Sequence, residues 1–144
     1  MKIAPCYYIT GNHEAWISKT QYTDFENKLA QLGVIILHDK EVILERNSSL
    51  ISLVGIDDPI FSEIHGGVTG HSMVPENIRN LVSIDSFTIL LSHRPEYFNQ
   101  YEKADFDLVL SGHAHGGQFR LPFVGGLIAP NQGFFPEHDA GIYT

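Results

Sequence analysis

The stretch Phe87-Thr88-Ile89-Leu90-Leu91-Ser92-His93-Arg94-Pro95 decides the fold class of this chain. Its first five residues form a continuous apolar run, which is typical of a strand covered on both faces of a sheet. A second apolar run spans Phe106–Leu110, and the intervening segment Pro95–Tyr101 is predicted to be a helix. Alternation of such strands with helices predicts a layered α/β fold, with β-sheets flanked by helices.

The upstream sequence extends the same pattern. Tyr22, Phe25, Leu29 and Leu32 recur at helical spacing, with Ser18 or Thr20 as a cap and Gly33 as the stop. The other elements that we expect are strands at Cys6–Thr10, Val34–Leu37, Val42–Leu44 and Leu50–Ile56, a surface loop at Glu63–Ser72, a short helix at Pro75–Val82, and irregular chain or a hairpin at Phe119–Ile128.

Length, charge and cysteine content bound the class of protein. With 144 residues the chain can form one domain with a core. A formal net charge of −8 makes nucleic acid an improbable partner, because no basic stripe exists to contact phosphates. The single cysteine, Cys6, excludes an internal disulfide and is expected to be a buried thiol. No apolar stretch is long enough to span a bilayer.

Three polar motifs each follow an expected strand: Gly11-Asn12-His13-Glu14, Ser92-His93-Arg94 and Gly112-His113-Ala114-His115. In open α/β sheets, ligands bind at the carboxyl ends of strands. Amide oxygen and imidazole nitrogen suit a first-row divalent metal. Alone, Asn12 would be read as a turn residue and His93 as a structural histidine, but the combination favours one shared metal site. The remaining histidines are expected to be exposed to solvent: His38, His65, His71 and His138.

The strings Gly-Asn-His-Glu, Ser-His-Arg-Pro and Gly-His-Ala-His-Gly-Gly-Gln resemble the calcineurin-like metallophosphoesterase family, in a form similar to its bacterial branch. The resemblance covers Thr10 to about Gln118 and implies a metallophosphoesterase domain across residues 1–144. It further implies a hydrolase of phosphate mono- or diesters with a dinuclear centre of divalent cations, either Mn, Fe or Zn. Such a pair of cations activates water and holds the phosphoryl oxygens.

The resemblance also assigns roles to individual residues. Asn12, His93 and His113 are expected to bind one cation and His115 the other, while His13 is the catalytic residue that assists the leaving group. Residues expected to contact substrate or to support these groups are Glu14, Arg94, Gly116 and Gln118. Glu14 either holds the His13 imidazole or is solvated, and Arg94 either contacts a phosphate or forms a surface salt bridge.

Two motifs of the family are missing from this chain. It contains neither the Asp-x-His nor the Gly-Asp-x-x-Asp that supply the bridging carboxylate and the rest of the second metal site. We therefore expect a partial domain, truncated at the N-terminus, with doubtful activity of its own. The alternative is a non-catalytic metal-binding fragment. The parent is expected to be either cytoplasmic or membrane-associated through an N-terminal segment, and the oligomeric state is left open.

Overall fold

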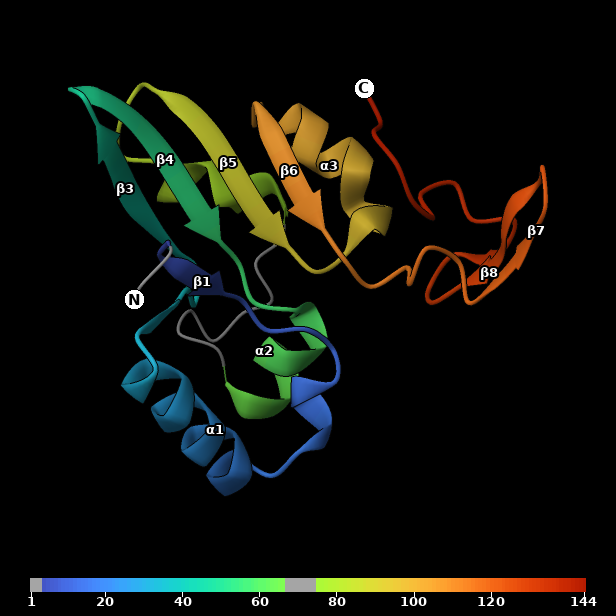
Figure 1. The fold of residues 1–144 in the computed structure, drawn as a ribbon, viewed down its shortest axis with the longest axis horizontal. Helices are drawn as coiled ribbons and strands as arrows, with labels where there is room; N and C mark the ends of the chain where they lie inside the picture. The colour runs from blue at the N-terminus through green and yellow to red at the C-terminus, as the bar shows by residue number, and fades with distance from the viewer. Residues whose placement is uncertain (1–3, 67–74) are drawn as a thin grey trace.

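A computed structural model describes residues 4–66 and 75–144 and confirms a mixed α/β architecture (Figure 1). Strands β1 (Cys6–Tyr8) and β2 (Val34–Ile36) form a parallel pair. The main sheet has the order β3-β4-β5-β6, in which only the β3–β4 pair is antiparallel. Its strands are β3 (Lys40–Arg46), β4 (Ser49–Gly55), β5 (Phe87–Ser92) and β6 (Leu108–Ser111).

Helix α1 (Lys19–Gln31) follows the predicted periodicity and cap. Ser18, not Thr20, caps it: the Gln21 amide donates to Ser18 Oγ, and the Gln21 side chain accepts from the Ser18 amide. This reciprocal pair satisfies amides that would otherwise lack a partner in the first turn. The helix ends before Gly33, whose φ of 82° lies in the left-handed region.

Several predicted boundaries are wrong. The first three residues of the loop expected at Glu63–Ser72 belong to helix α2 (Pro59–His65), which has Asp58 as its N-cap and Gly66 as its C-cap. Residues 67–74 lie outside the described part of the chain. The helix expected at Pro95–Tyr101 is a 3₁₀ turn, η3 (Pro95–Tyr97), followed by α3 (Phe98–Lys103). The helix expected from Pro75 is the 3₁₀ segment η2 (Pro75–Leu81).

The core lies on one face of the main sheet. Val54, Ile56 and Leu90 on that face pack with Ile78 of η2 and Tyr101 of α3. The strand residues between them point to the other face, where Phe87 is 49% exposed and Leu108 and Leu110 are 41% and 51% exposed. Coverage of both faces is therefore wrong for β6 and for the start of β5, whereas Leu53 of β4, which points to the same face as these residues, is 5% exposed and thus covered. The thiol of Cys6 is also exposed, contrary to expectation.

A small C-terminal sheet confirms the hairpin alternative for Phe119–Ile128. It consists of β7 (Phe119–Leu121), β8 (Gly125–Ala129) and β9 (Gly133–Phe134), all antiparallel. The strand β7 follows directly on the Gly-His-Ala-His-Gly-Gly-Gln string, so the hairpin sheet is covalently tied to one of the three polar motifs. Figure 1 shows it at one end of the molecule, beyond β6.

Candidate metal centre

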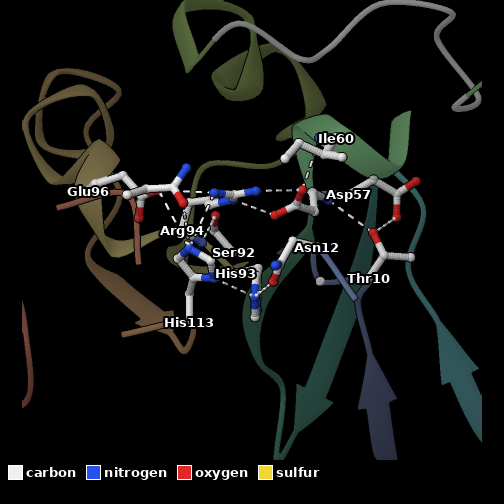
Figure 2. A network of polar contacts seen from close by, with 12 residues as sticks. Thr10, Asn12, Asp57, Ile60, Ser92, His93, Arg94, Glu96 and His113 are labelled. Carbon is white, nitrogen blue, oxygen red and sulfur yellow. Dashed lines mark hydrogen bonds and ion pairs between the residues drawn. The ribbon is translucent and has the colours of Figure 1, made fainter. Parts of the chain in front are cut away.

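Asn12, His93 and His113 lie together at the edge of the main sheet where β5 and β6 end (Figure 2). The Nε2 atom of His93 is 2.9 Å from Asn12 Oδ1 and 3.1 Å from His113 Nδ1. The two imidazole rings meet edge to face, with centroids 4.8 Å apart. The fold thus brings Asn12, which is 81 positions from His93 in sequence, and His113, which is 20 positions from it, to the same ring nitrogen of His93.

The two distances to His93 Nε2 are compatible with ligand atoms that share one divalent cation. Ligand atoms bonded at ~2.1 Å and at right angles to each other are about 3.0 Å apart. If His93 Nε2 carries a proton, that proton can form a good hydrogen bond with only one of the two neighbouring atoms. A cation placed between the three atoms would instead accept a lone pair from each of them. The donor set is one amide oxygen and two imidazole nitrogens, which suits Zn, Mn or Fe. Among residues 4–66 and 75–144, no three His, Cys, Asp or Glu side chains gather in this way, so the site depends on Asn12.

The electrostatic environment keeps both imidazoles neutral, which is the state a metal ligand requires. Burial, reinforced by the neighbouring His113, lowers the pKa of His93 to about 4. Burial and the adjacent Arg94 guanidinium likewise lower the pKa of His113. The lone pairs of both rings are therefore available at neutral pH.

Gly11 makes room for His93. A Cβ atom at this position would lie 2.9–3.0 Å from three atoms of the His93 ring, closer than carbon atoms normally approach. The φ of Gly11 is not in the left-handed region, so glycine is needed here for this close approach and not for its backbone conformation. Glu14 accepts a hydrogen bond from the Gly11 amide at 2.8 Å, which fixes the backbone beside Asn12.

The segment from His113 to His115 forms a turn and is not extended. His113 and His115 have φ values of 61° and 56°, and the Gly117 amide donates to the Ala114 carbonyl. This tight turn buries His113 at 6% exposure and leaves His115 exposed. Within the described part of the chain, no hydrogen bond, ion pair or ring contact involves the His115 side chain.

Arg94 forms a buried ion pair in place of the surface pair that was considered. Its Nε and Nη2 atoms donate to the Asp58 carboxylate at 2.5 and 3.0 Å, and the two side chains are 3% and 0% exposed. The remaining nitrogen, Nη1, lies 3.3 Å from both Glu96 Oε1 and His113 Nε2. The Arg94 guanidinium therefore lies against the His113 imidazole and is not exposed to solvent.

The other expected residues lie around this cluster. His13 is exposed and stacks on Trp16, with ring centroids 4.4 Å apart. Its imidazole makes no hydrogen bond to Glu14, because the carboxylate of Glu14 is turned to the backbone. The Gly116 carbonyl accepts a hydrogen bond from the Arg120 side chain. The backbone amide of the exposed Gln118 donates a hydrogen bond to the Ile128 carbonyl.

Three residues near the cluster were not among the expected site residues: Asp58, Glu96 and Asn131. Asp58 and Glu96 surround Arg94, and Asn131 Oδ1 lies 3.4 Å from His113 Nε2. Asp58 lies three residues after the end of strand β4 at Gly55, and this place near a strand end was the one usable indication in the sequence. Asn131 comes from the turn after β8, and no local pattern links that turn to the metal motifs.

A second polar cluster lies nearby on the same edge. The Nδ1 atom of His38 is 2.8 Å from both carboxylate oxygens of Asp57, and its Nε2 contacts Glu26. The hydrogen bond with Asp57 raises the pKa of His38 to about 9, and Glu26 adds to the effect. Asp57 also accepts from Thr10 at 2.8 Å, which ties this cluster to the segment before Gly11. The expectation that these histidines are exposed is therefore wrong for His38 and His65, which are half-buried, and for His138, which is buried; His71 lies outside the described residues.

Comparison with known proteins agrees with these observations. The sequence model of the calcineurin-like phosphoesterases matches residues 1–117. The metallophosphoesterase YkoQ of Bacillus subtilis (strain 168) is 27% identical over 145 residues, covering 95% of this chain and 50% of its own. A bovine "Transmembrane protein with metallophosphoesterase domain" is 35% identical over 146 residues, which cover 95% of this chain and 30% of the bovine protein. "Phosphodiesterase YaeI" of Escherichia coli (strain K12) is 24% identical over 127 residues, covering 88% and 43%.

The chain spans half or less of the length of these three relatives. They come from bacteria and from an animal, so the resemblance is not confined to a bacterial branch. No solved structure matches the chain significantly. No helix in the described ranges is both long and apolar enough to cross a bilayer. Because the family model covers most of the residues, including all three polar motifs, the chain belongs to the calcineurin-like phosphoesterase family.

Proposed function

We propose that the protein containing this chain is a metal-dependent phosphoesterase that hydrolyses phosphate mono- or diesters. The observation that carries the proposal is the approach of Asn12 Oδ1 and His113 Nδ1 to His93 Nε2, at 2.9 and 3.1 Å. Membership of a phosphoesterase family supports the reaction class. The two neutral imidazoles, of which His113 is buried and His93 half-buried, and the amide oxygen of Asn12 support a divalent cation as the cofactor.

In this proposal each residue of the chain has a defined task. Asn12, His93 and His113 hold one cation, and the exposed His115 supplies one ligand of a second site, whose other ligands come from outside this chain. Divalent cations at such a centre polarise the phosphoryl group and lower the pKa of bound water. His13 lies next in sequence to Asn12 and is exposed, so it can deliver a proton to the departing oxygen of the ester.

The surrounding charges support a small phosphate ester over a polynucleotide. The chain has 9 Lys and Arg residues against 17 Asp and Glu residues. Of the two arginines closest to the polar motifs, Arg94 is committed to Asp58, and Arg120 contacts Asp139 at 3.0 Å. Neither arginine is free to neutralise an extended phosphate backbone, and such neutralisation is the main source of nucleic-acid affinity.

A second candidate is a domain that binds metal without catalysis. The absence of Asp-x-His and Gly-Asp-x-x-Asp from the sequence favours it, because a centre without the bridging carboxylate would position a cation but not a complete pair. Both candidates predict binding of a divalent cation through His93 and His113. They differ in whether phosphate esters are turned over.

The genomic sequence upstream of the Met1 codon separates the two candidates. A continuous reading frame that encodes both missing motifs supports the enzyme. The protein from that frame should then hydrolyse aryl phosphate mono- or diesters with Mn²⁺, and its His93→Ala variant should not. A full-length protein that binds Mn²⁺ through His93 but releases no phosphate or aryl alcohol would establish the non-catalytic alternative.

A further inference from the structure

We propose that Glu96 is a positioning residue of the metal centre: its carboxylate accepts a hydrogen bond from Nε2–H of His113 and thereby orients that ring for cation binding through Nδ1. This inference rests on the proposed function, because it assumes that His113 is a ligand. The inference goes beyond the proposed function because it adds a carboxylate that does not touch the cation.

The argument begins with the two ring nitrogens of His113. Nδ1 faces His93 Nε2 at 3.1 Å and is therefore the atom directed at the proposed cation. A neutral imidazole carries one proton, so a lone pair on Nδ1 requires the proton on Nε2. The side chain is 2% exposed, so water does not provide a ready acceptor for that N–H group.

Three groups surround Nε2 of His113. Arg94 Nη1 is 3.3 Å away, Asn131 Oδ1 is 3.4 Å away and Glu96 Oε1 is 4.0 Å away. A guanidinium can only donate hydrogen bonds, so Arg94 pairs with Nε2 only when the proton is on Nδ1. In the tautomer that binds metal, the acceptor must be Glu96 or Asn131.

Charge and hydrogen-bonding capacity favour Glu96 over Asn131. The three proposed ligands are all neutral, so a carboxylate beside them compensates part of the cation's charge and makes the imidazole a stronger donor of electrons. Oε2 of Glu96 is buried and has no hydrogen-bond partner within the described residues. The carboxylate therefore has an unused acceptor site close to the ring.

Glu96 is held close to His113 by the buried arginine. The Asp58 carboxylate occupies Nε and Nη2 of Arg94, which leaves Nη1 to donate to Glu96 Oε1 at 3.3 Å. A shift of about 1 Å brings Oε1 from 4.0 Å to hydrogen-bonding distance of His113 Nε2. Asp58, Arg94 and Glu96 thus form a chain of charges that ends at the imidazole.

The first test is the affinity of the 144-residue chain for Zn²⁺, measured by isothermal titration calorimetry. We expect Glu96→Gln to weaken binding by about 10–100-fold, the usual effect of losing a hydrogen-bond partner of a ligating histidine. Glu102→Gln removes an exposed carboxylate from α3 and is expected to leave the affinity unchanged. Asn131→Ala should weaken binding less than Glu96→Gln, and thermal melts of each variant establish that it is folded.

The second test needs no substitution. ¹⁵N-histidine NMR of the Zn²⁺-loaded chain should show the His113 proton on Nε2, with Nδ1 bound to the metal. Binding through Nε2, or a Glu96→Gln affinity equal to that of the wild type while His113→Ala abolishes binding, overturns the role of Glu96 alone. A wild-type chain that binds no Zn²⁺ would overturn the proposed cation site together with this inference.

Discussion

Replacing Gly11 by alanine tests the packing that brings the proposed ligands Asn12, His93 and His113 together. The new Cβ would lie 2.9–3.0 Å from three atoms of the His93 ring, against ordinary carbon contacts of about 3.5–4.0 Å. The ring must therefore move by roughly 0.5–1 Å, which exceeds the ±0.2 Å tolerance of a metal–ligand distance. His93 Nε2 is the atom that both other ligand atoms approach, so its movement disturbs the whole set.

We expect Gly11→Ala to lower the Zn²⁺ affinity of the chain by at least tenfold and to cost about 1–3 kcal/mol of stability through overpacking. Gly112→Ala is the matched control, because its Cβ would lie at an ordinary 3.7 Å from His93 Nδ1. Calorimetric titration gives the affinities, and urea denaturation gives the free energies of unfolding. Equal Zn²⁺ affinities for the wild type and for Gly11→Ala would refute the claim that this close approach positions His93.

Three further predictions concern charge, activity and association. Because the folded pKa of His38 is raised to about 9, its stabilisation of up to ~3 kcal/mol is complete below about pH 6.5 and is lost as the pH rises through 9. His38→Asn should therefore be less stable than the wild type at pH 6 and similar at pH 10, and a constant difference in melting temperature would contradict this. The isolated chain should turn over aryl phosphate esters far more slowly than roughly 1 s⁻¹ with Mn²⁺, since it lacks the family's bridging carboxylate; ordinary enzymatic turnover after stringent purification would show otherwise. The open face of the main sheet, where Leu110 is 51% exposed, should make the chain self-associate, and Leu110→Lys should reduce this in sedimentation velocity; a monodisperse wild-type monomer is the contrary result.

The elements with strong local patterns could be predicted from the sequence. The capping box of Ser18 and Gln21 and the apolar spacing of α1 are both local, and the structure has both. The boundaries of β6 and α2 were missed because they depend on packing: Phe106 belongs to the core beside Tyr101, before the strand begins at Leu108. Coverage of the sheet could not be read from apolar runs, which look the same whether one face is packed or two.

The candidate site also has parts that could be predicted from the sequence and parts that could not. The convergence of the three motifs was expected from their places at strand ends, a rule of topology that does not need side-chain detail. The choice of Asn12, His93 and His113 as one set came from the family resemblance. The exposure of His115 beside the buried His113 accompanies positive φ values at both residues, which are uncommon outside glycine and are not encoded in a recognisable pattern. Residues such as Asn131 reach the cluster only through the long-range path of the chain.

Anomalous diffraction from crystals of the chain soaked in Zn²⁺ tests the central claim most directly, because it locates the cation without reference to activity. The account predicts one peak within about 2.0–2.2 Å of Asn12 Oδ1, His93 Nε2 and His113 Nδ1 together. A fully occupied peak at other residues, with the three side chains left without metal, would contradict it.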